Sequence, residues 1–502
     1  MSVRPRHAVR LAAISLLLVT PLAAQAVPLP PPPAAAFPLQ AGEVVATYCP
    51  NDRSSNGNSV ILVDPRTPGP IGSNWLAPFF SNETGAVAER WNYSNLGCVF
   101  GVATDLRPNI YVTASSSYGD FGIFSASLGG TYGPAGGGGV YRIDGVTGNI
   151  DSWMVTGSGA VNTNTLYNPM IAGNTPAGLG DICYDSKWDQ FFVSDFADGR
   201  IYQVKNGTGA LAGKGVVQGV YDPFLPFPYA GNPLFAPLGE RVWAVHVTTL
   251  WKYSKRPGAT FRRALLFSVW LRDRGPGPAG DVARQTTPWP ASWPANLGPN
   301  SDNNAIFEWD LDFQGNPVSS GPTLWAIMPT LDGQTYSSPV SDITTSVQTP
   351  KPSRVYVAER TMVGDYGALG NGHLARVLQF KLVFKLVTSF TWPPPPDPDL
   401  HAYQVGDYPS DGPGWNSCGG IAAWLRSTHL TSLGYLWSTG DALLDYIAGN
   451  YVYGLQGIPG DGNQNLTAPK SSTSLLIDLD HDISVPDKAE PGDVEYVPRN
   501  AH

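Results

Sequence analysis

The sequence has few charged residues, and fewer of them are basic than acidic. Charged side chains make up 14% of the 502 residues, against roughly 25% in typical soluble domains. There are 31 Lys and Arg against 40 Asp and Glu, which gives a formal net charge of −9. Because nucleic-acid binding needs a clustered basic face, this balance argues against nucleic acid as a partner.

Several motifs of catalysis and cofactor attachment are missing. The chain has no G-x-S-x-G elbow, no H-E-x-x-H pair and no C-x-x-C-H haem site. Its only cysteines, Cys49, Cys98, Cys183 and Cys418, are too widely spaced for a zinc finger. Four cysteines in an oxidising compartment predict two disulfides with three possible connectivities, or buried thiols.

Long apolar runs are also absent after the amino-terminal segment. Arg4, Arg6 and Arg10 precede the apolar stretch 11–23, which is too short to span a bilayer, and Ala24-Gln25-Ala26 has the small-x-small pattern of a cleavage site. We therefore expect residues 1–26 to be a signal peptide without a lipid-anchor cysteine. Their removal takes away three arginines and moves the formal charge to −12. The mature chain is predicted to be secreted or periplasmic, with no membrane span.

The residues that are abundant indicate a turn-rich all-β domain. Gly (56) and Pro (47) are frequent, aromatic residues are 11% and apolar residues are 42%, enough for a large core. We expect a flexible Pro- and Ala-rich lead-in at 27–42, one domain at 43–497 and a tail at 498–502.

One phrase recurs, and its fullest copy is GDICYDSKWDQFFVSDFADGRIYQV at 180–204. It predicts three short antiparallel strands joined by tight turns. Its first strand is matched at 101–105, 342–346 and 493–496, and its second at 109–113, 241–245 and 354–358. Its third strand is matched near positions 141, 252, 308, 378 and 452, with a further copy at 60–64.

A blade-sized meander repeated in this way predicts a β-propeller with long loop insertions. Six third strands favour six blades. The strand at 60–64 either closes the ring against residues 474–497 or belongs to a seventh blade. The phrase at 180–204 resembles the blades of secreted six-bladed propellers of the NHL, TolB-like and gluconolactonase-like kind, which share its GDIxYD, lyVsD and grIyxv strands. The gluconolactonase-like members imply a Glu/Asn/Asp metal site in the tunnel for lactone hydrolysis, and that site does not map residue by residue onto this chain.

One helix is predicted among the insertions. The segment DALLDYIA at 441–448 has the composition of a short helix above a blade. The connections at 119–139, 275–303 and 393–418 are longer than ordinary hairpin loops.

Two groups of carboxylates are candidate sites for Ca²⁺ or another divalent cation. The first is Asp478, Asp480 and Asp482, at alternate positions of one segment, although Ile483 and Ala489 depart from a calcium-binding loop. The alternative is a charged, solvated edge strand. The second is Asp181, Asp342 and Asp493, which hold the same place in three first strands and would converge on the tunnel. The alternative is that these Asp side chains accept hydrogen bonds from backbone amides.

A third candidate site combines Asp195, His246 and Glu359. In the repeat alignment each follows a second strand, so the three would lie at similar heights around one rim and form a binding or catalytic site. His246 would be the best placed of the histidines for catalysis, with a structural role as the alternative.

The sequence therefore predicts an exported, monomeric β-propeller that binds an unknown protein or glycan. The alternative is a metal-dependent, lactonase-like hydrolase with its site at the tunnel, and a third possibility is a purely structural protein. A binding module predicts a filled tunnel and an exposed aromatic patch on one rim. A hydrolase predicts a divalent ion held by carboxylates from at least three blades in a pocket open to solvent.

Overall fold

The computed structural model describes residues 38–50, 57–107, 109–115, 132–157, 178–223, 241–252, 260–270, 273–274, 281–282, 304–329, 337–345, 354–360, 375–381, 401–406, 416–423, 435–445, 447–459, 471–479 and 490–498. The chain divides into two compact units, 1–32 and 33–502, and every described residue belongs to the second. The predicted signal peptide, most of the lead-in and most of the tail lie outside the described residues.

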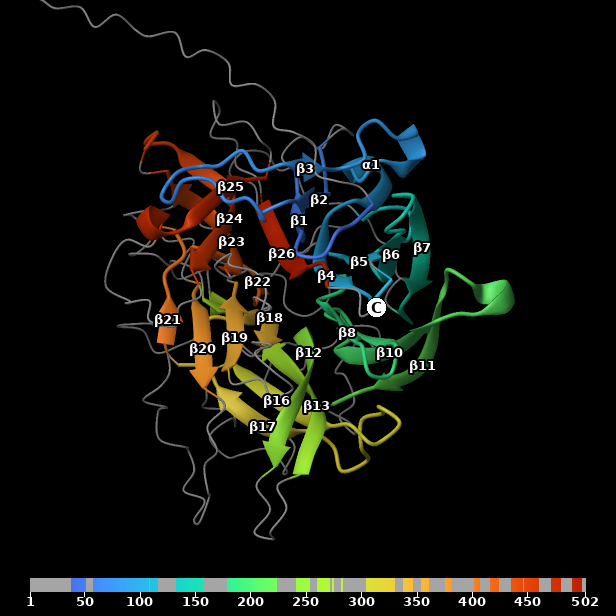
Figure 1. Ribbon diagram of the computed structural model, residues 1–502. Coiled ribbons are helices and arrows are strands. Elements are labelled where there is room, and N and C mark those ends of the chain that lie inside the picture. Colours follow the sequence, from blue (N-terminus) through green and yellow to red (C-terminus); the bar gives the residue numbers. More distant parts are fainter. Residues whose placement is uncertain are drawn as a thin grey trace, which may run out of the picture. The chain divides into compact units, whose positions relative to one another are not determined.

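Six four-stranded antiparallel sheets form a six-bladed β-propeller (Figure 1). From the inside outwards, blade 1 contains β26 (Glu490–Tyr496), β1 (Val44–Cys49), β2 (Val60–Val63) and β3 (Phe79–Phe80). Blade 2 contains β4 (Val99–Thr104), β5 (Ile110–Ala114), β6 (Gly139–Ile143) and β7 (Ile150–Val155). Blade 3 contains β8 (Ile182–Asp185), β9 (Gln190–Asp195), β10 (Arg200–Asn206) and β11 (Gly215–Tyr221).

The other three blades repeat this order. Blade 4 contains β12 (Arg241–Lys252), β13 (Thr260–Trp270), β16 (Ala305–Asp310) and β17 (Thr323–Ile327). Blade 5 contains β18 (Val340–Thr345), β19 (Arg354–Glu359), β20 (Val377–Lys381) and β21 (His401–Tyr403). Blade 6 contains β22 (Ser417–Ala422), β23 (Tyr435–Leu444), β24 (Tyr451–Pro459) and β25 (Leu475–Asp478).

Helices are few and short in the part of the chain that the structure describes. They are α1 (Tyr93–Leu96) and the single 3₁₀ turns η1 (Val87–Glu89), η3 (Gly209–Leu211) and η5 (Ser471–Thr473). A small hairpin of β14 (Asp273–Arg274) and β15 (Asp281–Val282) lies outside the six sheets. None of the described helices is long and apolar enough to cross a membrane.

The two ends of the propeller sequence close the ring within one blade. β26 pairs antiparallel with β1, so that Val44 lies opposite Tyr496 and Ala46 opposite Val494. The strand at 60–63 is the third strand of this closing blade, although it pairs with β1 and β3 and not with residues 474–497 as predicted. The described sheets form six blades and not seven. Cys49, the last residue of β1, forms a disulfide with Cys98 just before β4. Cys183 and Cys418 are buried and take no part in a disulfide, so one of the two predicted disulfides forms.

Two sequence-based assignments are wrong. Residues 241–245 and 250–253, predicted as a second and a third strand, belong largely to the inner strand β12, whose partner β13 is the true second strand. First and second strands are both short apolar runs, so local composition does not distinguish them.

The predicted helix at 441–448 is the end of β23 followed by a tight turn. A bulge between Gly440 and Leu443 places Ala442 at a φ of 48°, and Leu443 pairs with Val452. The carboxylate of Asp445 then accepts the N–H groups of Ile447 and Ala448. Sheet pairing therefore outweighs the helical preference of these residues.

Adjacent blades are linked by a ring of hydroxyl groups close to the inner strands. In five blades, a Ser or Thr of the second strand donates to a backbone carbonyl of the next inner strand; the donor–acceptor pairs are Thr47–Phe100, Thr113–Gly180, Ser194–Trp243, Ser268–Val340 and Thr439–Gly492. In blade 5 the corresponding position is Ala358, and Ser341 of the first strand donates instead to Gly419, at 2.8 Å. Each blade interface is therefore closed by one such bond.

We expect Ser194→Ala to lower the free energy of unfolding by about 2 kcal/mol. The Ser194 hydroxyl accepts the Asp181 N–H at 2.8 Å and donates to the Trp243 carbonyl, so its loss leaves two buried backbone groups without this partner. Denaturant unfolding of the variant measures the effect. Ser152→Ala, at an exposed position of β7, is the matched control and should change stability by less than about 0.5 kcal/mol. Equal stability of both variants would contradict a structural role for this bond.

Candidate functional site

At one level of the tunnel, Asp alternates with a small residue around the six inner strands. In blade order the six positions are Asp493, Gly101, Asp181, Ala244, Asp342 and Gly420. The backbone N–H groups of Asp493, Gly101, Asp181, Ala244 and Gly420 each donate to the linking hydroxyl of their own blade, which fixes the common level. The sequence prediction that the three Asp residues hold equivalent places is therefore correct.

The three carboxylates converge. Asp181, Asp342 and Asp493 each offer one oxygen atom, and these three atoms lie within 4.8 Å of one another. The residues are only 2%, 6% and 2% exposed, respectively. Three acidic groups from blades 1, 3 and 5 thus form a closed cluster on the propeller axis, which we call the axial triad.

Each carboxylate of the axial triad binds the backbone of two blades. Asp181 accepts the N–H of Ile182 in its own blade at 2.6 Å and that of Val245 in blade 4 at 3.0 Å. Asp493 accepts Val494 at 2.7 Å and Val102 of blade 2 at 2.8 Å.

Asp342 completes the pattern. It accepts the N–H of Ile421 in blade 6 at 2.7 Å and is also stabilised by the N–H of Ile343 in its own blade. The inner edge of each inner strand would otherwise leave one N–H group here without an acceptor. Three carboxylates therefore serve all six strands, which explains why one Asp is needed for every two blades.

The small residues between the Asp residues are required by the close approach of neighbouring strands. A Cβ atom on Gly101 would lie 2.6 Å from the Cα of Asp181, and one on Gly420 would lie 2.5 Å from the Cα of Asp493. Both contacts are shorter than carbon atoms tolerate, and the partner is backbone that cannot turn away. Glycine at these positions brings the strand that carries the next Asp close to the axis.

Burial and mutual repulsion keep protons on the axial triad. Burial first, and then the charge of Asp342, raises the pKa of Asp181 and of Asp493 well above the usual range of an aspartate. Burial also raises the pKa of Asp342 to about 6, against the lowering effect of its hydrogen bond with Asp493. Three ionised carboxylates at this separation would repel one another, so the triad needs either shared protons or a cation.

One step further along the inner strands, the residues have a different chemistry. The residues two positions after the axial level include Glu495, Cys183, His246 and Thr344. Burial, and then the charge of Asp342, raises the pKa of the half-buried Glu495 to about 8. Burial and the nearby Arg263 lower the pKa of His246 to about 4, and its Nε2 lies 3.0 Å from the Thr345 hydroxyl oxygen. His246 is therefore neutral at neutral pH and linked to blade 5.

The structure does not bring Asp195, His246 and Glu359 to one rim in the way the repeat alignment predicted. His246 belongs to the inner strand β12, whereas Asp195 and Glu359 end the second strands β9 and β19. Asp195 accepts the N–H groups of Ala197 and Asp198 and the hydroxyl of Thr156, which is the turn-forming role. Glu359 is buried in a two-pronged ion pair with Arg376, with both distances 2.9 Å.

The other carboxylate candidate is only partly within the described residues. Asp478 is the last residue of β25 and is buried, with its N–H donating to Asn74 at 3.1 Å. Asp480 and Asp482 lie outside the described residues. Burial of Asp478 departs from the solvated edge strand proposed as the alternative to calcium binding.

A second surface, which sequence reasoning missed, lies across blades 2, 3 and 4 on the rim formed by the turns between first and second strands and between third and fourth strands. We call it the rim patch: Leu106, Arg107, Tyr184, Lys187, Trp188, Asp189 and Phe313. Arg107 of blade 2 pairs with Asp189 of blade 3 at 3.6 Å, and the Tyr184 hydroxyl donates to Asp189 at 2.9 Å. The amino group of Lys187 lies 4.8 Å from the ring centre of Trp188. The signal in the sequence was a Trp in a tight turn, where small polar residues are usual.

Blade 4 covers one part of Trp188 and adds an exposed aromatic ring. Gly315, at a φ of 87°, packs so closely on Trp188 that a Cβ atom would lie 2.5 Å from Cδ1 of the indole. The Gly315 carbonyl accepts the amide of Gln190 in β9 at 2.8 Å. Phe313 in the same turn is 78% exposed. The rim patch therefore combines aromatic rings with paired charges across three blades.

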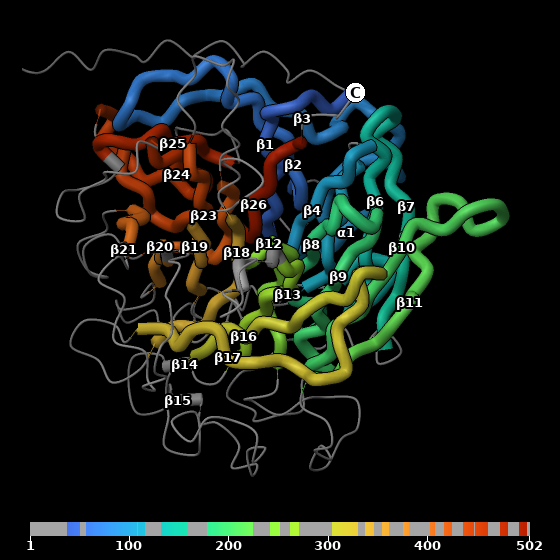
Figure 2. The backbone as a smooth tube through the Cα atoms, turned by 60° about the horizontal axis from the view of Figure 1, so that its bottom comes forward, coloured from blue at the N-terminus to red at the C-terminus, as the bar shows by residue number. Residues whose placement is uncertain are grey.

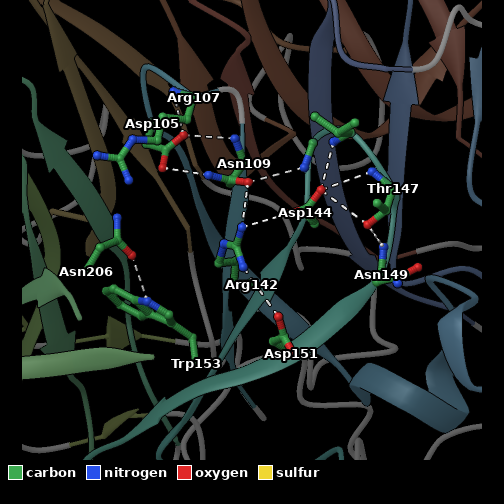
Figure 3. Close-up of polar contacts among 12 residues, drawn as sticks. Asp105, Arg107, Asn109, Arg142, Asp144, Thr147, Asn149, Asp151, Trp153 and Asn206 are labelled. Atoms are coloured by element: carbon green, nitrogen blue, oxygen red, sulfur yellow. Dashed lines mark hydrogen bonds and ion pairs between the residues drawn. The ribbon is translucent and has the colours of Figure 1, made fainter. Parts of the chain in front are cut away.

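The neighbouring turns of blade 2 are held by a polar network that makes this rim rigid (Figure 3). Asp105 accepts hydrogen bonds from the backbone N–H of Arg107, the backbone N–H of Asn109 and the side-chain amide of Asn109, each at 2.9 Å. Asn109 accepts the guanidinium of Arg142 at 3.0 Å, and Arg142 also pairs with Asp144 at 2.8 Å. The turn that carries Leu106 and Arg107 is thus fixed to the turn after β6.

Comparisons with known proteins give only distant matches to solved structures. No protein-family model and no curated protein matches the chain. Among solved structures, a nidogen/laminin complex aligns over 91% of this chain and 98% of that chain, at 8% identity and a TM-score of 0.37. Putative 6-phosphogluconolactonases from Bacteroides uniformis and Bacteroides fragilis align over 91% and 92% of this chain and 100% and 99% of theirs, each at 11% identity and a TM-score of 0.34. Such values carry no argument about activity, and the propeller assignment stands on the six sheets themselves.

Proposed function

We propose that this chain is an exported propeller that binds a glycan or a protein through the rim patch. The observation that supports this most is the aromatic surface of Tyr184, Trp188 and Phe313, placed by three blades beside the Arg107–Asp189 pair. Aromatic side chains with a polar rim are typical of binding surfaces, where Trp, Tyr and Arg contribute most of the binding energy. The Cys49–Cys98 disulfide suits an oxidising compartment such as the periplasm or the exterior.

The closure of the tunnel also favours binding over hydrolysis. The axial triad is almost fully buried, and its oxygen atoms accept backbone N–H groups on both sides. A hydrolytic metal needs an open coordination position for water and substrate. The inner ring thus serves as a rigid support, and the turns at its rim are the variable surface.

Binding to an array of immobilised oligosaccharides tests this proposal. Trp188→Ala should weaken binding at least tenfold, because truncating a central Trp typically costs about 2 kcal/mol or more. Ile447→Ala is the matched control, since Ile447 is an exposed apolar residue in a turn after a second strand, on the opposite rim. Equal binding by the Trp188→Ala variant would contradict the proposal. An array on which the wild type binds nothing would remove the glycan class and leave a protein partner.

A metal-dependent hydrolase is the second candidate, supported by the convergence of three carboxylates from three blades within 4.8 Å. Asp181, Asp342 and Asp493 would hold Ca²⁺ or another divalent cation, and His246 and Glu495 lie next along the tunnel. Elemental analysis of the purified chain and a thermal shift on adding a chelator test it. An unchanged melting temperature and a metal-free protein would remove this candidate.

A further inference from the structure

The outer edge of blade 3 differs from the other outer edges in having no protection against strand pairing. Exposed edge strands are usually short, charged, or interrupted by proline. β3 and β21 have two and three residues, β7 contains Asp151, and β17 has five residues directly after Pro322. The outer side of β25 is covered by a bridge between Leu476 and Asn74. β11 has seven residues, Gly215–Tyr221, with neither charge nor proline. No described strand pairs with its outer edge.

Apart from Gln218 at the bulge, the exposed side chains of β11 are apolar. Val217 is 42% exposed and Val220 is 49% exposed, although both lie within a regular strand. The views in Figures 1 and 2 place β11 on the outside of blade 3, beyond β10. Two β-branched residues on an open edge are typical of a strand that accepts another strand.

A bulge determines which register a second strand can adopt. β11 pairs with β10 as Gln203 with Gly219 and then Val204 with Val217, so that β11 has one extra residue at Gln218. The residues whose N–H and C=O groups point away from β10 are odd-numbered on one side of Gln218 and even-numbered on the other side. Two copies of β11 related by a two-fold axis can therefore pair only when the opposed residue numbers add up to an odd number.

Among the pairings that meet this condition, the one centred on β11 places the two-fold axis between Gln218 and Gly219. It sets Val217 of one copy opposite Val220 of the other, twice, and Val216 opposite Tyr221. Directly opposed pairs of β-branched and aromatic side chains stabilise antiparallel strands. No charged residue lies opposite one of like sign, since Gly215–Tyr221 has no charge and Asp222 falls opposite Gly215.

We propose that β11 pairs antiparallel with β11 of a second copy of this chain and forms a symmetric dimer. The two four-stranded sheets of blade 3 then form one continuous sheet across the two-fold axis. The interface lies on the side of the propeller, so the rim patch stays open in both copies. This proposal differs from the sequence-based expectation of a monomer.

Sedimentation of the purified full chain tests the dimer. The wild type should show twice the monomer mass at high concentration and dissociate on dilution. Val217→Lys places two charges in the interface and should give the mass of one copy, with an unchanged circular dichroism spectrum because Val217 faces solvent. Val155→Lys, at a 49% exposed position on the outer strand β7, is the matched control and should leave the dimer intact.

Cross-linking tests the register. When Val217→Cys and Val220→Cys chains are mixed and oxidised, the disulfide should join one chain of each kind, because these positions face each other across the axis. If the wild type has the mass of one copy at every concentration, the proposal is wrong, even if β11 pairs with a strand of a different protein. A dimer that persists in Val217→Lys would overturn it as well.

Discussion

Asp493→Ala should lower the free energy of unfolding by about 4 kcal/mol at pH 6. The substitution leaves the N–H groups of Val494 and Val102 buried without an acceptor, and each unsatisfied group costs about 1–3 kcal/mol. It also removes a carboxyl group that burial and two like charges disfavour in its ionised form. The raised pKa of Asp493 means that the native state favours its protonated form, so relief of repulsion is small and the lost hydrogen bonds decide the sign. Denaturant unfolding monitored by tryptophan fluorescence measures the difference.

Two variants make this prediction specific. Asp493→Asn keeps the shape and one acceptor oxygen, so it should lose about half as much stability as the alanine variant. Asp151→Ala removes a half-exposed carboxylate whose only described ion pair is with Arg142 at 3.3 Å, and it should change stability by less than about 1 kcal/mol. If Asp493→Ala were as stable as Asp151→Ala, the axial triad would not hold the blades together.

Stability should fall as pH rises from 5 to 8 when divalent cations are removed. The carboxyl groups of the axial triad and of Glu495 have pKa values above those of the unfolded chain, with Asp342 at about 6 and Glu495 at about 8. A group whose pKa is raised by folding contributes stability that is complete below its unfolded pKa, near 4, and is lost as pH passes its folded pKa. Each proton linked to folding gives a slope of about 1.4 kcal/mol per pH unit.

Calcium should oppose this loss if a cation can replace the protons. Its effect on the melting temperature should then be larger at pH 8 than at pH 5, because protons compete for the same oxygen atoms. Burial also raises the pKa of Glu43 to about 7 and that of Asp198 to about 8, so both contribute to the slope. His246, with its pKa lowered to about 4, opposes the slope below its unfolded pKa but is one group against several. Asp342→Asn distinguishes the contribution of the axial triad to this slope from that of Glu43 and Asp198. The variant should show a smaller slope of stability against pH than the wild type and no response to calcium. A stability that rises with pH, or an equal slope in this variant, would contradict the assignment.

Much of the fold could be predicted from sequence because each blade repeats one local pattern. The phrase at 180–204 gave β8, β9 and β10 almost to the residue, and the strand at 60–63 lies in the blade that closes the ring, although its partners differ from the prediction. The prediction failed in blade 4, where the twelve-residue strand β12 was divided into a second and a third strand. Alternation of apolar residues reports burial on a strand but not the strand's place in its sheet.

The candidate sites were predictable to different degrees for a physical reason. The equivalence of Asp181, Asp342 and Asp493 follows from repeat position, so their convergence could be expected. Their use as acceptors for two blades each could not, because it depends on inner-edge N–H groups and on Gly101 and Gly420 in the strands between them. The rim patch was missed for a related reason: it is built by turns of three blades that are far apart in sequence.

The pairing of β26 with β1 sets the order in which the native protein can form. The hydroxyl of Thr47 accepts the N–H of Asp493, a contact that spans 446 residues, and Asp493 in turn holds blade 2. Neither contact exists until the last part of the chain has been made. Folding of the ring is consequently dominated by long-range contacts and should be slow compared with helical proteins of similar size. The same dependence means that the ring stays open until the last inner strand has been synthesised.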